Sequence, residues 1–201
     1  MDENVIKNKF LKDLSNKTWI TMKARFTAAE RMNKFYNYSN ICISLSSAII
    51  VCLGVVAFLP PNEALEQKIS IVTFFESITI LVISLLSTQA KFDKKGEIYH
   101  ACACELTEYN DVLKLYIDQN KILNFEEKKS LVQEYNSIIK KYNLNHSTVD
   151  YYRARIVNEN KTENRVSSCQ RLENYIRWYF FNCGTIFILI PILLVLIIFI
   201  I

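Results

Sequence analysis

Glu76 is an acidic residue inside an otherwise apolar run, ISIVTFFESITILVISLLST, which occupies residues 69–88. The run has about the length, roughly 20 residues, that a helix needs to cross the hydrocarbon of a membrane. An ionised carboxylate at that depth costs a few kcal/mol, so such residues usually face a water-filled cavity, a polar partner or the interior of an assembly. Glu76 is therefore a candidate for lining a path for cations.

Hydroxyl side chains accompany Glu76 at helical spacing. The apolar run and its end contain five of them at intervals of three, four or seven, namely Ser70, Thr73, Ser77, Ser84 and Thr88. On a helix they share one side, with Glu76 at its edge beside Thr73 and Ser77. The preceding apolar run has a similar series that includes Ser44 and Ser47. Two such stripes on neighbouring helices could line an aqueous path if several copies assembled around an axis.

A second interpretation of the same residues requires no path. Serine and threonine hydroxyls often bond to the backbone of their own helix, and small residues let membrane helices approach closely. Glu76 would then be neutral or near the outer interface, where it would help the helices to pack.

The nearest approach to a metal motif is the segment His100-Ala-Cys102-Ala-Cys104. Residues two apart point to roughly opposite sides of a helix, so His100 and Cys104 share a face from which Cys102 turns away. Three ligands do not converge there, and zinc sites favour wider spacing between paired ligands. No metal and no cofactor are expected.

Other chemistry finds little support in the sequence. His146 and Asp150 have the spacing of a hydrogen-bonded pair that stabilises a turn, and a contact with a ligand or partner is the alternative. With 3 glycines in the chain, of which Gly54 and Gly184 lie in apolar runs, a phosphate-binding loop is not expected. We therefore expect a protein that is not an enzyme.

The elements that position these residues follow from where the apolar residues gather. Blocks at 41–59, 69–88 and 179–201 each have close to the length of a membrane span, and Glu76 is the one charged residue within them. The chain has few glycines and prolines, and the charged regions show helical spacing. The sequence predicts an all-α membrane protein with a transmembrane hairpin, a C-terminal third span and a cytoplasmic helical bundle or coiled-coil-like stalk.

The basic residues predict the orientation in the membrane. They lie before the first span and after the second, at Lys23, Arg25, Arg31, Lys34, Lys91, Lys94 and Lys95, whereas the connector 60–68 holds Lys68 alone. The positive-inside bias then places the N-terminus and residues 89–175 in the cytoplasm and the C-terminus outside. Anionic lipid headgroups are the expected counter-charge. With 24 Lys and Arg against 20 Asp and Glu, nucleic acid binding is not expected.

The same patterns divide the chain into four regions. They are a basic amphipathic approach helix at 1–38, the hairpin at 39–90, a helical region at 91–175 and the third span at 176–201. Within the third of them, apolar residues recur from Tyr99 to Ile117, a helix start is expected at Asn124 with Glu127, and another near Thr148. Residues 158–168 have the composition of a solvated linker or a polar surface helix.

Three segments in this order resemble the SLATT-domain proteins: MKARFTAAERMNKFYNYSN at 22–40, KFDKKGEIYHACACELTEYNDVLKLY at 91–116, and NLNHSTVDYYRAR at 143–155. The resemblance covers about residues 19–157 and rests on architecture and loosely spaced residues. The family is named for two spans, and this chain has a third apolar block.

The resemblance implies a small bacterial membrane effector of nucleotide-activated or reverse-transcriptase-associated antiphage systems. Such effectors are thought to form pores that halt or kill the infected cell. It implies an oligomer in the lipid bilayer, gated through its cytoplasmic helices by a sensor, a nucleotide-generating enzyme or a reverse transcriptase. A non-conducting membrane anchor that recruits cytoplasmic partners is the alternative.

Overall fold

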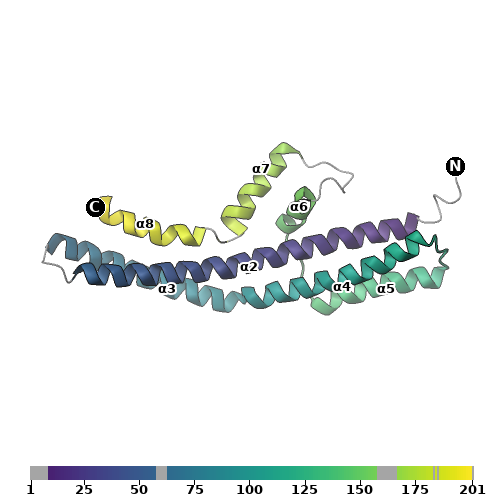
Figure 1. The fold of residues 1–201 in the computed structure, drawn as a ribbon, viewed down its shortest axis with the longest axis horizontal. Coiled ribbons are helices and arrows are strands. Elements are labelled where there is room, and N and C mark those ends of the chain that lie inside the picture. The colour runs from purple at the N-terminus through teal and green to yellow at the C-terminus, as the bar shows by residue number, and fades with distance from the viewer. Residues whose placement is uncertain (1–8, 58–62, 158–166, 183, 185, 201) are drawn as a thin grey trace. The chain divides into compact units, whose positions relative to one another are not determined.

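The computed structural model describes residues 9–57, 63–157, 167–182, 184 and 186–200. These residues are almost entirely helical, with no strand among them (Figure 1). The elements in chain order are α2 (Lys9–Ala57), α3 (Glu63–Ala90), α4 (Phe92–Asp118), α5 (Phe125–Tyr142), α6 (Thr148–Val157), α7 (Ser168–Ile176), the π-helix η2 (Arg177–Asn182) and α8 (Ile186–Ile200). The predicted all-helical fold is confirmed.

The elements belong to two compact units. Unit 1 lies within Met1–Arg31 and Lys94–Tyr175, and unit 2 lies within Met32–Asp93 and Ile176–Ile201. Helix α2 contributes its N-terminal part to unit 1 and its C-terminal part to unit 2.

Two stretches of the described chain are long and apolar enough to cross a membrane. The first is α2, in which the predicted approach helix and first span form a single helix of 49 residues. No proline interrupts it, and its one glycine, Gly54, is near its end. The second extends from Glu63 to Asp118 and includes Lys91, the single residue between α3 and α4. Lys91 has a φ of 49°, so the helix is interrupted there and not at Gly96, which lies buried within α4.

Helices α2, α4 and α5 share the hydrophobic core of unit 1. Its buried members are Leu11, Leu14, Met22, Cys102, Leu106, Tyr109, Leu113, Leu123, Leu131, Tyr135 and Ile138. From Cys102 to Leu113 on α4 and from Leu131 to Ile138 on α5 these residues recur at three- or four-residue intervals, which places them on the side that faces the neighbours. Burial of one such leucine stabilises the unit by about 1.5–3 kcal/mol. The apolar side of the predicted approach helix is therefore covered by protein over Leu11–Met22.

Helix α5 begins as its sequence predicts. The Asn124 side chain accepts a hydrogen bond of 2.8 Å from the backbone N–H of Glu127. The Glu127 carboxylate in turn accepts one of 2.8 Å from the backbone N–H of Asn124. This capping box satisfies two N–H groups that the first turn leaves without helical partners. Helix α6 likewise begins at Thr148, as expected.

Removal of the α5 cap should have a small, measurable cost. Asn124→Ala should lower the free energy of unfolding of unit 1 by about 1 kcal/mol, because a backbone N–H loses its acceptor. Thermal unfolding of the full chain in detergent micelles, followed by circular dichroism, would measure it. Asn136→Ala, at an exposed position inside the same helix, is the control and should change stability by less than about 0.5 kcal/mol. Equal effects of the two changes would contradict the capping role.

In unit 2, α8 packs against α3. Helix α8 has 15 residues and therefore spans about 22 Å, which is less than the roughly 30 Å of hydrocarbon. The predicted third span is not confirmed. A physical reason lies at Gly184, which precedes α8 with a φ of 70°, a conformation that ends or interrupts helices. A Cβ at this glycine would lie 2.7 Å from Cδ1 of Phe35, so the close approach also requires glycine.

Candidate functional site

Glu76 is fully buried in unit 2, with an exposed fraction of 0%. Helix α3 buries Ile69, Val72 and Ile83 along with it. These four positions follow one another at intervals of three, four and seven, so they form a single stripe along α3. Glu76 therefore belongs to the side of α3 that packs against protein.

The Glu76 carboxyl group has neither oxygen in a hydrogen bond within the described part of the chain, and both oxygens are buried. Its neighbour is α2, because Glu76 interacts electrostatically with the Cys42 thiol, which is 1% exposed. Ser46 lies one helical turn beyond Cys42 and is also fully buried. Burial of an acidic group is costly here, since no hydrogen bond from the described residues offsets the hydration that it loses.

The hydroxyl residues lie elsewhere on the hairpin helices. Ser77 is exposed and donates a hydrogen bond of 2.8 Å to the carbonyl of Thr73, which is half-buried. Ser84 is exposed and accepts one of 2.8 Å from Thr88 through its carbonyl. The structure therefore separates Glu76, which faces inward, from the outward-facing hydroxyls that the sequence placed beside it.

On α2, Ser44 and Ser47 are exposed. Ser47 donates a hydrogen bond of 2.8 Å to the carbonyl of Ile43. Bonds of this kind, to the preceding turn of the same helix, satisfy a hydroxyl without any partner from another helix.

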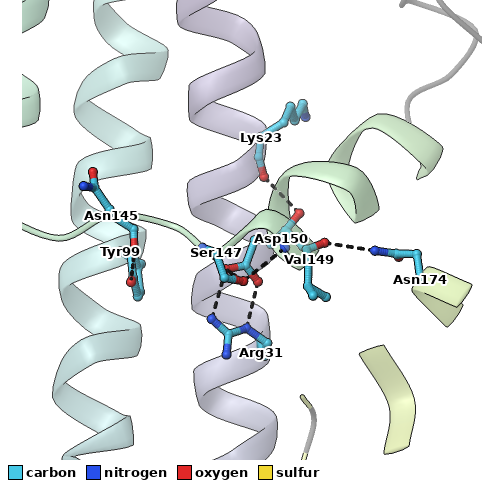
Figure 2. Close-up of polar contacts among 9 residues, drawn as sticks. Lys23, Arg31, Tyr99, Asn145, Ser147, Val149, Asp150 and Asn174 are labelled. Atoms are coloured by element: carbon cyan, nitrogen blue, oxygen red, sulfur yellow. Dashed lines mark hydrogen bonds and ion pairs between the residues drawn. The ribbon is translucent and has the colours of Figure 1, made fainter. Parts of the chain in front are cut away.

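A second polar site lies in unit 1, where α6 is held on α2. Arg31 donates two hydrogen bonds to the Asp150 carboxylate, from Nε at 2.8 Å and from an Nη at 3.0 Å (Figure 2). The backbone N–H and the hydroxyl of Ser147 each donate to the same carboxylate at 2.9 Å. Asp150 is 0% exposed, so a buried charge is here matched by a fork-shaped cation and two further donors. We call Arg31, Asp150 and Ser147 the clamp.

The connector before α6 is held by its carbonyl groups. Arg25, which is 1% exposed, donates to the carbonyl of Leu144 and lies with its guanidinium carbon 5.6 Å from the ring centre of Tyr99. The Tyr99 hydroxyl donates to the carbonyl of Asn145 at 2.7 Å (Figure 2). Burial raises the pKa of Tyr99, and the neighbouring Asp150 acts in the same direction. The phenol is thus kept as a hydrogen-bond donor.

Helix α7 also contacts α6. Its Asn174 donates a hydrogen bond of 3.2 Å to the carbonyl of Val149 (Figure 2). Residues 144–150 are therefore bound by side chains from α2, α4 and α7.

His146 and Asp150 are neighbours without being the pair that the sequence suggested. No hydrogen bond joins them in the described residues. The His146 ring stacks on Tyr151 with centroids 6.4 Å apart, and its Nδ1 is buried without a hydrogen-bond partner. Burial lowers the pKa of His146, the Arg25 charge lowers it further, and Asp150 opposes both.

The His146 surroundings predict a loss of stability in acid. Because the folded-state pKa is below the ordinary 6.5, folding favours the neutral ring. This contribution is complete above pH 6.5 and is lost as the pH falls through the lowered value. Unit 1 should unfold at lower urea concentration near about pH 5 than near about pH 8.

His146→Gln should reduce that pH difference, because the glutamine does not titrate. Urea titration of both proteins at the two pH values measures it. An unchanged difference would show that other groups cause the pH dependence.

The basic residues predicted to lie at the membrane interface differ in their surroundings. Lys91, Lys94 and Lys95 are exposed, and Lys23 is half-buried. The Lys34 ammonium lies 5.9 Å from the Trp178 ring centre and 5.7 Å from that of Tyr179, within unit 2. Lysine beside tryptophan and tyrosine is typical of a membrane interface.

Arg25 and Arg31 differ from the expected lipid contact, because their guanidinium groups bind Leu144 and Asp150 within unit 1. The sequence contained a signal for this. Met22, Arg25, Ala29 and Met32 follow one another at intervals of three and four, and Arg25 continues the buried stripe.

The fold and these sites define a class of protein: an all-helical membrane protein with two helices that could cross the bilayer and a folded polar unit. The sequence model of one family, described as SMODS and SLOG-associating 2TM effector domain family 5, matches residues 7–198. The chain belongs to this family, abbreviated SLATT, and is thus a membrane-associated effector domain of defence systems. The match reaches beyond residue 157 and includes the C-terminal apolar segment. No curated protein and no solved structure matches the chain.

Proposed function

We propose that the protein is an oligomeric effector that opens a path for cations across the bacterial inner membrane when a defence signal reaches it. The observation that carries this proposal is Glu76, an acid enclosed in the hairpin unit without a hydrogen-bond partner among the described residues. Packing alone favours an apolar residue at such a position, since an acid in a membrane span costs a few kcal/mol. A function in which the carboxylate becomes exposed to water would explain why an acid occupies this position.

The described arrangement is that of a closed state, because Glu76 is covered. Opening would turn the Glu76 side of α3 toward water and would separate it from Cys42 on α2. Two spans cannot enclose a water path, so several copies are required. Glu76 would then repeat around an axis as an acidic ring, which favours cations. The exposed hydroxyls of Ser44, Ser47, Ser77 and Ser84 would border the path or its contacts between copies.

In this proposal the signal passes along one continuous helix, α2. Helix α2 enters unit 2 directly after Arg31, and Arg31 is the residue that the clamp holds. An event that releases Asp150 from Arg31 would therefore act on the helix that continues into the hairpin. A signal can do this only by binding the open state better than the closed state.

The family name associates such domains with SMODS and SLOG partners. A partner sensor or a nucleotide-generating enzyme is accordingly the proposed source of the signal, with a reverse transcriptase as a further possibility from the resemblance above. In this proposal unit 1 is cytoplasmic, as the basic residues Lys91, Lys94 and Lys95 favour.

Membrane potential and growth of bacteria test the proposal. Wild type, Glu76→Gln and Glu76→Leu are expressed at matched levels, with and without the neighbouring genes. Wild type should depolarise the cells, and both variants should change the extent of depolarisation. Glu63→Gln, at an exposed position at the start of α3, is the matched control and should behave as wild type. Depolarisation that is the same in all four proteins would remove Glu76 from the path.

The second candidate function is a membrane anchor that presents unit 1 to partners. The hydrogen bonds of Ser47, Ser77 and Thr88 to their own helices favour it, because these hydroxyls need no water. An anchor should keep its function when both spans are replaced by unrelated apolar helices. A pore should lose it.

A further inference from the structure

His100 and Cys104 form a pair of metal-binding side chains on the outer surface of α4. They are four residues apart, and Sγ of Cys104 lies 3.6 Å from Nδ1 of His100. His100 is exposed and Cys104 is partly exposed. The imidazole and the Phe26 ring pack edge to face, with ring centroids 5.5 Å apart and planes at 76°.

The separation of the two atoms is that of adjacent ligands on a tetrahedral zinc ion. Zinc binds cysteine sulfur at about 2.3 Å and histidine nitrogen at about 2.0–2.1 Å, so two such ligands at a tetrahedral angle lie about 3.6 Å apart. The distance between the two atoms, which join in a hydrogen bond here, thus matches that of two ligands on one ion. Binding would release the thiol proton to solvent and would leave the imidazole proton on Nε2.

The other cysteines of unit 1 lack this geometry. Cys102 is 0% exposed within the hydrophobic core, so its thiol is covered by protein and is not presented to a metal ion in solvent. Cys169 is exposed on α7, but the position four residues on is Glu173 and no histidine lies on that helix. The pair on α4 is thus chemically distinct from its neighbours.

We propose that His100 and Cys104 are one half of a site for a zinc-class cation, and that the same pair of a second copy of this chain completes it. The described residues contain no group of three or more His, Cys, Asp or Glu side chains that could hold a metal, so in this proposal the second copy supplies the remaining ligands. Two pairs give the two-cysteine, two-histidine set that closes a structural zinc site. The acidic residues on either side, Glu97 and Glu108, are exposed and attract the cation.

This inference goes beyond the proposed function, because the pair lies outside the hairpin. A metal that joins copies through α4 would serve a pore and an anchor equally. The metal ion would fix how unit 1 of one copy contacts unit 1 of the next.

Cobalt binding to the full chain in detergent micelles tests the inference. Tetrahedral cobalt bound by thiolate has intense visible and near-ultraviolet absorption, and zinc should displace it. We expect saturation at one cobalt ion per two chains. Cys104→Ser and His100→Ala should abolish the absorption, whereas Cys169→Ser should retain it, as the matched exposed cysteine.

Saturation at one ion per chain, or an absorption that persists in Cys104→Ser, would overturn the inference. Glu76→Gln should bind cobalt as the wild type does. Failure of the metal site and failure of the conducting path are therefore separable.

Discussion

Asp150→Ala should lower the free energy of unfolding of unit 1 by about 3–5 kcal/mol, the cost of removing one partner of a buried ion pair. Asp150 is 0% exposed and accepts two hydrogen bonds from Arg31. Its loss would leave the Arg31 charge without a partner and the Ser147 N–H without an acceptor. Because domains are stable by about 5–15 kcal/mol in total, the variant should be close to unfolding.

The buried thiol of Cys102 offers a local measurement. Its labelling by a maleimide in increasing urea reports the opening of the unit 1 core, in a background where the other cysteines are replaced. Arg31→Met with Asp150→Leu is the control, since exchanging both partners of a buried pair for apolar residues is often neutral. A loss below about 1 kcal/mol for Asp150→Ala would mean that the clamp does not hold α6.

Leu106→Ala should cost about 2–5 kcal/mol, because it opens a cavity at the centre of unit 1. Leu106 is 0% exposed and belongs to the core shared by α2, α4 and α5. The same labelling of Cys102 would measure the loss.

Leu115→Ala is the matched control on the same helix. Leu115 is 57% exposed, so its truncation should change stability by less than about 0.5 kcal/mol. If both substitutions lowered the free energy of unfolding by the same small amount, that result would contradict the burial of Leu106 in the core of unit 1.

The core of unit 1 could be predicted from the sequence because local rules agree there. Leu106, Tyr109 and Leu113 recur at helical spacing, and each is buried as that spacing predicts. The start of α5 follows from Asn124 and Glu127, whose side chains satisfy the first turn whatever lies around it.

The partners of the polar side chains could not be predicted in the same way. Arg25 and Leu144 are far apart in the sequence, as are Arg31 and Asp150, so these contacts depend on how α2 meets the segment between α5 and α6. A basic residue before a span has two common uses, as a lipid contact and as an internal partner. The orientation of the helix decides between them.

The position of Glu76 shows what a hydroxyl pattern does not report. Ser77 and Ser84 share a side of α3, but small hydroxyl residues satisfy themselves and leave the packing to larger side chains. Ile69, Val72 and Ile83 bury more apolar area, and their stripe includes Glu76. The third span stays a prediction: the composition of the C-terminal block fits a span, and Gly184 has a backbone conformation that hydropathy does not report.

In the proposed open state Glu76 is part of a path for cations. The most direct measurement is the conductance of planar bilayers that contain the purified full chain, wild type or Glu76→Gln, with a salt gradient across the membrane. We expect channel currents with a reversal potential near that of the cation for wild type, and a shift of this potential toward zero for Glu76→Gln. Currents whose selectivity does not change with Glu76, or no current under activation by the partner, would contradict it.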